Sequence, residues 1–99
     1  MFLFSSINRG LEECRRTEGA LLVDVREPEE YAAGHIPGAV NAPLSKLDEA
    51  RLPKDRPLFL YCLRGTRSAR AAGLLRRRGY GRVRSIGGIA GYKGQIERR

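Results

Sequence analysis

The sequence predicts a three-layer α/β domain, in which a central parallel sheet carries helices on both faces. Apolar runs rich in β-branched residues and bounded by turn residues alternate with stretches of helical periodicity. Strands and crossover helices of a parallel sheet follow each other in this way. The alternation is not interrupted by a repeat or a long linker, and 99 residues suit one domain. We therefore expect a single domain over residues 1–99.

A first amphipathic helix is expected near the start of the chain. Ile7, Leu11 and Cys14 recur at i, i+4 and i+7, which is the spacing of one helix face. Ser5 or Ser6 can cap its first turn. The side chain of Cys14 then faces the core.

The next elements alternate strand and helix. The run ALLVDV at 20–25 is typical of a strand buried on both faces of a parallel sheet. A short helix is expected over 28–34, because proline suits its first turn and a glycine can end it. A brief strand is expected at 39–41, and the segment 45–57 predicts a helical turn or two closed by prolines.

The second half of the chain repeats this alternation. The run LFLYC at 58–62 is the second clear strand, and the alanines and leucines at 71–75 place one apolar stripe on the helix after it. A last strand is expected at 82–86. The segment 87–99 is interpreted as a terminal helix interrupted by glycines.

Two polar residues end predicted strands. Asp24 closes the first strand and Cys62 closes the strand at 58–62. In parallel α/β sheets ligands bind at the carboxyl ends of the strands. We therefore expect Asp24 and Cys62 to meet at one edge of the sheet, which is the candidate site.

The turn after Cys62 predicts a stabilised thiolate. A turn that runs directly into a helix leaves backbone N–H groups without helical partners. Because Gly65 permits positive φ, the amides of residues 63–68 can converge on the Cys62 sulfur. The helix dipole, Arg64 and Arg67 add positive potential, and such settings lower a cysteine pKa from its usual ~8.5. We expect Cys62 to be a nucleophilic thiolate.

Composition limits the other functions. The net charge of +8 suits nucleic acid, anionic surfaces and small anions alike. Arginine supplies 16 of the 19 basic residues, spread from Arg9 to Arg99. The run at 76–78 lies in the last turn of a predicted helix, where cations oppose the helix dipole. Nucleic-acid binding is therefore not expected.

The same composition bears on location and cofactors. No stretch approaches the ~20 apolar residues of a membrane span, and the opening MFLF lacks the features of a signal peptide. We expect a cytoplasmic protein without membrane contact and with both cysteines reduced. One histidine and no CxxC spacing argue against a zinc site and dithiol redox chemistry. We expect no metal and no organic cofactor.

Three blocks of sequence carry a family resemblance. LLVDVREPEEYAAGHIPGAVNAPL, YCLRGTRSARAAGLLRRRGY and VRSIGGIAGY, in this order, resemble a single-domain rhodanese over nearly the whole chain. The resemblance implies a rhodanese-like fold and a sulfurtransferase that uses thiosulfate or a persulfide, with Cys62 as the catalytic sulfur carrier. The loop implied to bind the donor comprises Leu63, Arg64, Gly65, Thr66 and Arg67. Members with a related loop often have arginine directly after the cysteine, where this chain has Leu63, and this departure bears on donor preference.

The implied mechanism is a double displacement. The Cys62 thiolate attacks the outer sulfur of a small anionic donor, expels sulfite or a thiol, and holds a persulfide for an acceptor. The acceptor is cyanide, a thiol or a cysteine of a partner protein. Arg64 and Arg67 attract the donor by charge, although Arg67 can instead hydrogen-bond to its own loop. Asp24 and Ser68 are expected to support the loops without touching the donor.

One pair of charged residues and one histidine have structural interpretations. Arg26 and Glu30 are expected to pair across the start of their helix. His35 could be taken for a general base, but a persulfide carrier with a lowered pKa needs none. We expect a structural hydrogen bond from His35.

Two alternatives to a sulfurtransferase are considered. Cysteine phosphatases also hold a thiolate at a helix N-terminus, but their Cys-x5-Arg pattern would put arginine at position 68. This chain has Ser68 there and Arg67 one place earlier, so its loop suits a single sulfur. A non-enzymatic interaction or sulfur-relay module, whose basic surface meets an acidic partner, would have the same loop and remains open.

Overall fold

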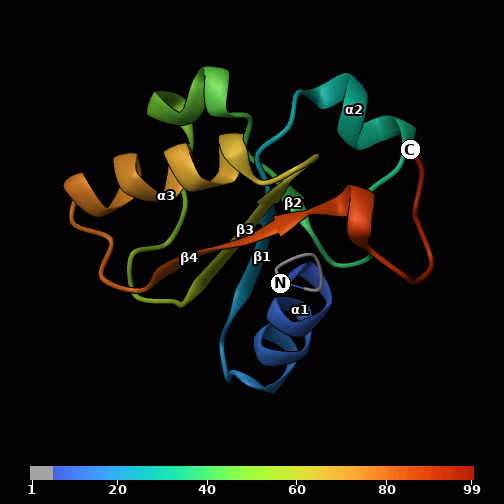
Figure 1. The fold of residues 1–99 in the computed structure, drawn as a ribbon. Coiled ribbons are helices and arrows are strands. Elements are labelled where there is room, and N and C mark those ends of the chain that lie inside the picture. The colour runs from blue at the N-terminus through green and yellow to red at the C-terminus, as the bar shows by residue number, and fades with distance from the viewer. Residues whose placement is uncertain (1–5) are drawn as a thin grey trace.

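A parallel four-stranded sheet in the order β2-β1-β3-β4 forms the centre of the computed structural model, which describes residues 6–99 (Figure 1). The strands are β1 (Leu21–Asp24), β2 (Val40–Asn41), β3 (Leu58–Cys62) and β4 (Val83–Gly88). The helices are α1 (Ser6–Arg16), α2 (Pro28–Ala33) and α3 (Thr66–Arg77), with 3-10 turns η2 (Leu44–Glu49) and η3 (Ile89–Gly91). The predicted strands all occur, with ends within two residues of their expected positions.

Helices cover both faces of the sheet, as predicted. Figure 1 shows α1 on one side of the strands and α3 with η2 on the other. Successive residues of β3 point to opposite faces, because side chains alternate along a strand. Leu58, Leu60 and Cys62 therefore pack on the α3 side, and Phe59 and Tyr61 pack on the α1 side. This three-layer arrangement confirms the expected fold class.

The α1 layer is built by the residues whose spacing predicted it. Ile7 is 1% exposed, Leu11 2% and Cys14 9%, so Cys14 faces the core as expected. Ser5, one of the two predicted caps, and the MFLF segment lie outside the described residues.

The predicted terminal helix over 87–99 is wrong. Gly87 and Gly88 belong to β4, η3 makes a single turn, and the chain beyond runs back to α2. There the backbones of His35 and Glu97 exchange two N–H···O bonds of 2.8 Å. Each glycine inside a helix costs about 1 kcal/mol relative to alanine. The glycine-rich segment instead bonds to a neighbouring backbone.

No helix within residues 6–99 combines the length and apolar character needed to cross a bilayer.

Candidate active site

The end of β3 and the start of α3 enclose the Cys62 sulfur. β3 ends at Cys62, α3 begins at Thr66, and Gly65 before it has φ +108°, which turns the chain into the helix. This left-handed conformation favours glycine. Cys62 is 1% exposed, so the sulfur lies beneath its own loop.

Backbone amides point at this sulfur, as the sequence predicted. The Gly65 N–H donates to Sγ at 2.9 Å and the Ser68 N–H donates at 3.4 Å. Burial alone would raise the pKa of Cys62, but hydrogen bonds from Ser68, Gly65 and Arg64 outweigh it and lower that pKa below its usual value. By contrast, burial raises the pKa of Cys14, and the charge of Arg15 only partly opposes this. The surroundings of the two thiols therefore lower the pKa of Cys62 and raise that of Cys14.

A pair of serines extends the hydrogen-bond network around Cys62. The Ser68 hydroxyl oxygen lies 3.7 Å from Sγ, 3.1 Å from the Gly65 carbonyl oxygen and 2.6 Å from the Ser85 hydroxyl oxygen. While Cys62 is a thiol, its S–H donates to this hydroxyl, which donates to Gly65; once Cys62 is a thiolate, the hydroxyl can turn and donate to Sγ. Ser85 comes from β4 and pairs in register with Leu60, two residues before Cys62. Sequence reasoning missed Ser85, although its place on the α3-facing side of the last strand was a usable signal.

Gly88 of β4 lies directly against the backbone of the loop that follows Cys62. The register between β3 and β4 shifts between Leu60 and Cys62, so that Cys62 lies beside Gly88. A Cβ atom at Gly88 would overlap the backbone of Leu63 and Arg64. The Ala90 N–H donates to the Leu63 carbonyl at 3.1 Å. The close contact between the loop and β4 therefore leaves no room for a side chain at position 88.

The two arginines of the loop have different surroundings. The Arg67 guanidinium makes a forked ion pair with Glu30 of α2, at 2.7 and 3.1 Å. The guanidinium bonds to no group of its own loop, which corrects that interpretation, while attraction of a donor by Arg67 stays a prediction. Arg64 is exposed, and within residues 6–99 it has no ion-pair partner. Of the other loop residues, Leu63 is half-buried and Thr66 is exposed.

The predicted pair between Arg26 and Glu30 is wrong. Arg26 instead pairs with Asp24, which is fully buried. The Asp24 carboxylate accepts the Arg26 backbone N–H at 2.9 Å and its Nε and NH2 groups at 3.1 and 2.7 Å. Arg26 NH2 also donates to the Gly34 carbonyl at 2.7 Å. This pair joins the end of β1 to the end of α2.

Asp24 and Cys62 share an edge of the sheet, but their side chains do not meet. Asp24 pairs in register with Tyr61, and residues paired in this way point to the same face. Asp24 therefore lies on the α1 side and Cys62 on the α3 side. The expected meeting is corrected by the alternation of side chains along the strand. The geometry fits Asp24 as a support of the loops.

His35 makes structural contacts, as predicted. Its ring stacks on Tyr31 with centroids 3.7 Å apart, and its Nδ1 lies 2.9 Å from the Tyr31 carbonyl oxygen. Its Nε2 lies 3.5 Å from a Glu97 carboxylate oxygen. These contacts tie the C-terminal segment to α2.

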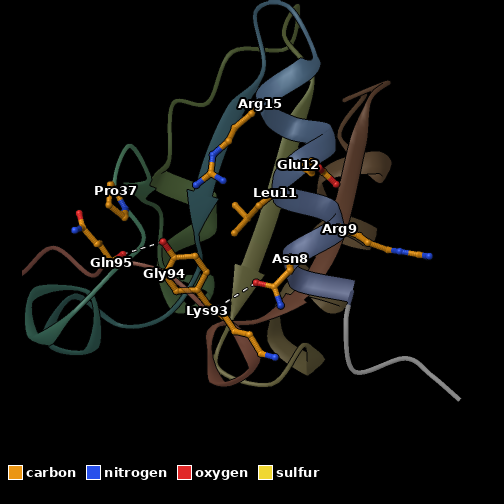
Figure 2. A pocket seen from close by; sticks show the side chains of 10 residues that line it. Asn8, Arg9, Leu11, Glu12, Arg15, Pro37, Lys93, Gly94 and Gln95 are labelled. Atoms are coloured by element: carbon orange, nitrogen blue, oxygen red, sulfur yellow. Dashed lines mark hydrogen bonds between the residues drawn. The ribbon is translucent and has the colours of Figure 1, made fainter.

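A cavity of about 620 Å³ lies away from the sulfur, between α1 and residues 92–95. Figure 2 shows Asn8 reaching across to Lys93, whose N–H donates to its side chain at 3.2 Å, while Arg9 points away. No residue of the loop 62–67 lines this cavity.

Within residues 6–99 no three metal-ligating side chains cluster. The arrangement around Cys62 is suited to holding a negatively charged sulfur.

Comparison with known proteins agrees with the fold. The family model described as "Rhodanese-like domain" matches residues 8–95. A protein named sulfurtransferase from Allochromatium vinosum is 46% identical, covering 74% of this chain and 71% of that protein. The thiosulfate sulfurtransferase GlpE of Pseudomonas entomophila is 39% identical, covering 74% and 69%.

Two further comparisons bear on chain length and on the fold. The matched region spans 64% of YqhL of Bacillus subtilis, which is 43% identical over 79% of this chain. The solved structure of a rhodanese-like domain protein from Staphylococcus aureus superposes with a TM-score of 0.80 at 25% identity, covering 94% of both chains.

Proposed function

The chain belongs to the rhodanese-like family, and from this we propose that it is a sulfurtransferase that carries a sulfane sulfur on Cys62. Relatives named sulfurtransferase support sulfur transfer in general. Our finer proposal is that thiosulfate or a persulfide is the donor, and that residues 1–99 act as one domain. Both cysteines are free thiols, which fits a reducing compartment such as the cytoplasm.

The observation that carries the proposal is the set of amides aimed at the Cys62 sulfur. The Gly65 and Ser68 N–H groups donate to Sγ at 2.9 and 3.4 Å. Preorganised donors stabilise charge without having to reorganise during a reaction. Before transfer these amides favour the Cys62 thiolate. After transfer the persulfide anion carries its charge at the same loop. This arrangement suits a nucleophile that must also store the product of its own attack.

The first half-reaction loads the sulfur. The Cys62 thiolate attacks the outer sulfur of thiosulfate, an S–S bond forms, and the donor's S–S bond breaks with its electron pair leaving on sulfite. Three negative charges enter and three leave, because the products are a Cys62 persulfide anion and sulfite. No oxidant or reductant is needed.

The second half-reaction releases the sulfur. A nucleophilic acceptor such as cyanide attacks the outer sulfur of the persulfide and leaves as thiocyanate, while the electron pair of the S–S bond returns to Cys62. A thiol or a cysteine of a partner protein can replace cyanide. The exposed Arg64 at the loop supplies positive potential toward an incoming anion.

Variants of the two cysteines test this proposal. Cys62→Ser should abolish thiocyanate formation from thiosulfate and cyanide, since a serine hydroxyl stays protonated and cannot hold a persulfide. Cys14→Ser is the matched control and should keep nearly full activity, with a modest loss of stability from a hydroxyl in the core. Equal activity of Cys62→Ser and the unchanged protein would contradict the proposal. Loss of activity in Cys14→Ser at unchanged stability would assign Cys14 a role in sulfur relay.

A further inference from the structure

The active-site loop holds two arginines, and only one of them is compensated. Arg67 is forked onto the Glu30 carboxylate, and both side chains are about one-third exposed, at 34% and 33%. Arg64 is exposed and has no such partner within residues 6–99. The loop therefore presents fewer uncompensated positive charges than its sequence suggests.

Glu30 is held in place by its own helix. Its carboxylate also accepts the Glu27 backbone N–H at 2.9 Å, which completes a capping box at the start of α2. The hydrogen bond from Arg67 lowers the pKa of Glu30 to about 2, against the smaller effect of burial. Glu30 is therefore charged throughout the neutral range.

Arg67 directly precedes Ser68, whose N–H donates to the Cys62 sulfur at 3.4 Å, so the charge of Arg67 lies near that sulfur. Besides Glu30, the negative charge of Cys62 helps to raise the pKa of Arg67. An arginine in this position, if uncompensated, would attract an anion toward Cys62. The paired carboxylate opposes that attraction, because it carries the opposite charge and its oxygens lie 2.7 and 3.1 Å from the Arg67 nitrogens.

We propose that Glu30 is a specificity-determining residue: by compensating Arg67, it favours singly charged persulfide donors over the doubly charged thiosulfate. This inference rests on the proposed sulfur transfer at Cys62. With a persulfide donor, the Cys62 thiolate bonds to the outer sulfur of R–S–S⁻, the donor's S–S bond breaks, and R–S⁻ leaves with its electron pair. Two negative charges enter and two leave, whereas thiosulfate brings one more to the same loop.

Glu30→Gln uncovers the charge of Arg67 with little change of shape. Glutamine also serves in a capping box, so the start of α2 should persist. The matched control is Glu29→Gln, which removes an equal charge from an exposed position of the same helix turn. Thermal unfolding checks that both variants fold.

The expected effects scale with the charge of the donor. Since Coulomb energy is proportional to charge, one uncovered cation should raise kcat/KM about threefold for a singly charged alkyl persulfide and about tenfold for thiosulfate. Glu29→Gln should change either value less than twofold. Salt should reduce the gain, because the charges lie at a screened surface.

Alkylation of Cys62 measures the same effect without sulfur transfer. The rates of the anionic reagent iodoacetate and the neutral reagent iodoacetamide are compared in a Cys14→Ser background. Their ratio cancels any change in thiolate fraction or loop opening, because both reagents attack the same sulfur. The ratio should rise about threefold in Glu30→Gln, fall in Arg64→Ala and change little in Glu29→Gln.

The two measurements separate the inference from the function on which it rests. An unchanged ratio in Glu30→Gln, or an equal rise in Glu29→Gln, overturns the role of Glu30 even if sulfur transfer proceeds. A raised ratio with no loading of Cys62 by either donor supports compensation of Arg67 but contradicts sulfur transfer and donor selection. A raised ratio together with a larger gain for thiosulfate than for the persulfide supports the inference in full.

Discussion

Ser68→Ala should make Cys62 less reactive at neutral pH. The substitution removes a hydroxyl that lies 3.7 Å from Sγ, and it keeps the Ser68 N–H that donates to the same sulfur at 3.4 Å. A hydrogen bond to a charged group contributes about 1.5–3 kcal/mol, and the long distance to sulfur favours the lower end of that range. Because ~1.4 kcal/mol corresponds to a factor of ten, thiolate formation should become about tenfold less favourable.

The assay is the rate of Cys62 alkylation by iodoacetamide as a function of pH, in a Cys14→Ser background. Loss of a donor to the thiolate raises the pKa of Cys62, so the rate profile should move to higher pH and the rate below the midpoint should fall about tenfold. Ser85→Ala is the matched control. It removes the partner at 2.6 Å but keeps the Ser68 hydroxyl, so its effect should be under threefold. A folded Ser68→Ala protein with an unchanged profile would refute the role of the hydroxyl and leave the amides alone responsible.

Two further predictions concern stability. Asp24→Ala should lower the free energy of unfolding by about 3–5 kcal/mol, because it strands the buried charge of Arg26. Glu13→Ala, which breaks an exposed ion pair, should cost less than about 1 kcal/mol, and equal losses by denaturant titration would contradict this reasoning. The Glu30–Arg67 pair should stabilise the fold fully above the unfolded Glu30 pKa near 4.5 and lose its effect as pH falls toward about 2. Glu30→Gln should therefore flatten the acid limb of stability against pH, by on the order of 1 kcal/mol given its solvent exposure, and an unchanged limb would count against the pair.

The parts of the site that were predictable are local in the sequence. The turn at Gly65, the start of α3 and the convergence of amides on Cys62 involve residues within one short segment, so general rules of turns and helix ends suffice. The alternation of strands and helices was predictable for the same reason. Each depends on periodicity and turn residues close together in the chain.

The parts that were not predictable depend on partners far apart in the chain. Arg67 and Glu30 are separated by 37 positions, and Ser68 and Ser85 by 17. Sequence spacing suggested that Arg26 would pair with Glu30, a neighbour on one helix. The fold gives each a different partner, because Asp24 at the strand end is buried beside Arg26 and the loop brings Arg67 over α2.

The role of the glycines in the segment 87–99 also depends on a distant part of the chain. From the sequence alone they predict an interrupted helix. In the structure Gly88 is required where the backbone of β4 touches the loop at Leu63. A close approach of two backbones leaves no periodic signal in a single sequence, so it could not be anticipated.

Intact-mass measurement after incubation with a sulfane donor tests the central claim most directly. The Cys14→Ser protein, incubated with thiosulfate or an alkyl persulfide, should gain the mass of one sulfur atom, located at Cys62 by peptide mapping. Cyanide should remove that mass with release of thiocyanate, and Cys62→Ser should gain nothing. A folded protein whose mass never changes with either donor would contradict a sulfur carrier at Cys62, and the interaction-module interpretation would then take its place.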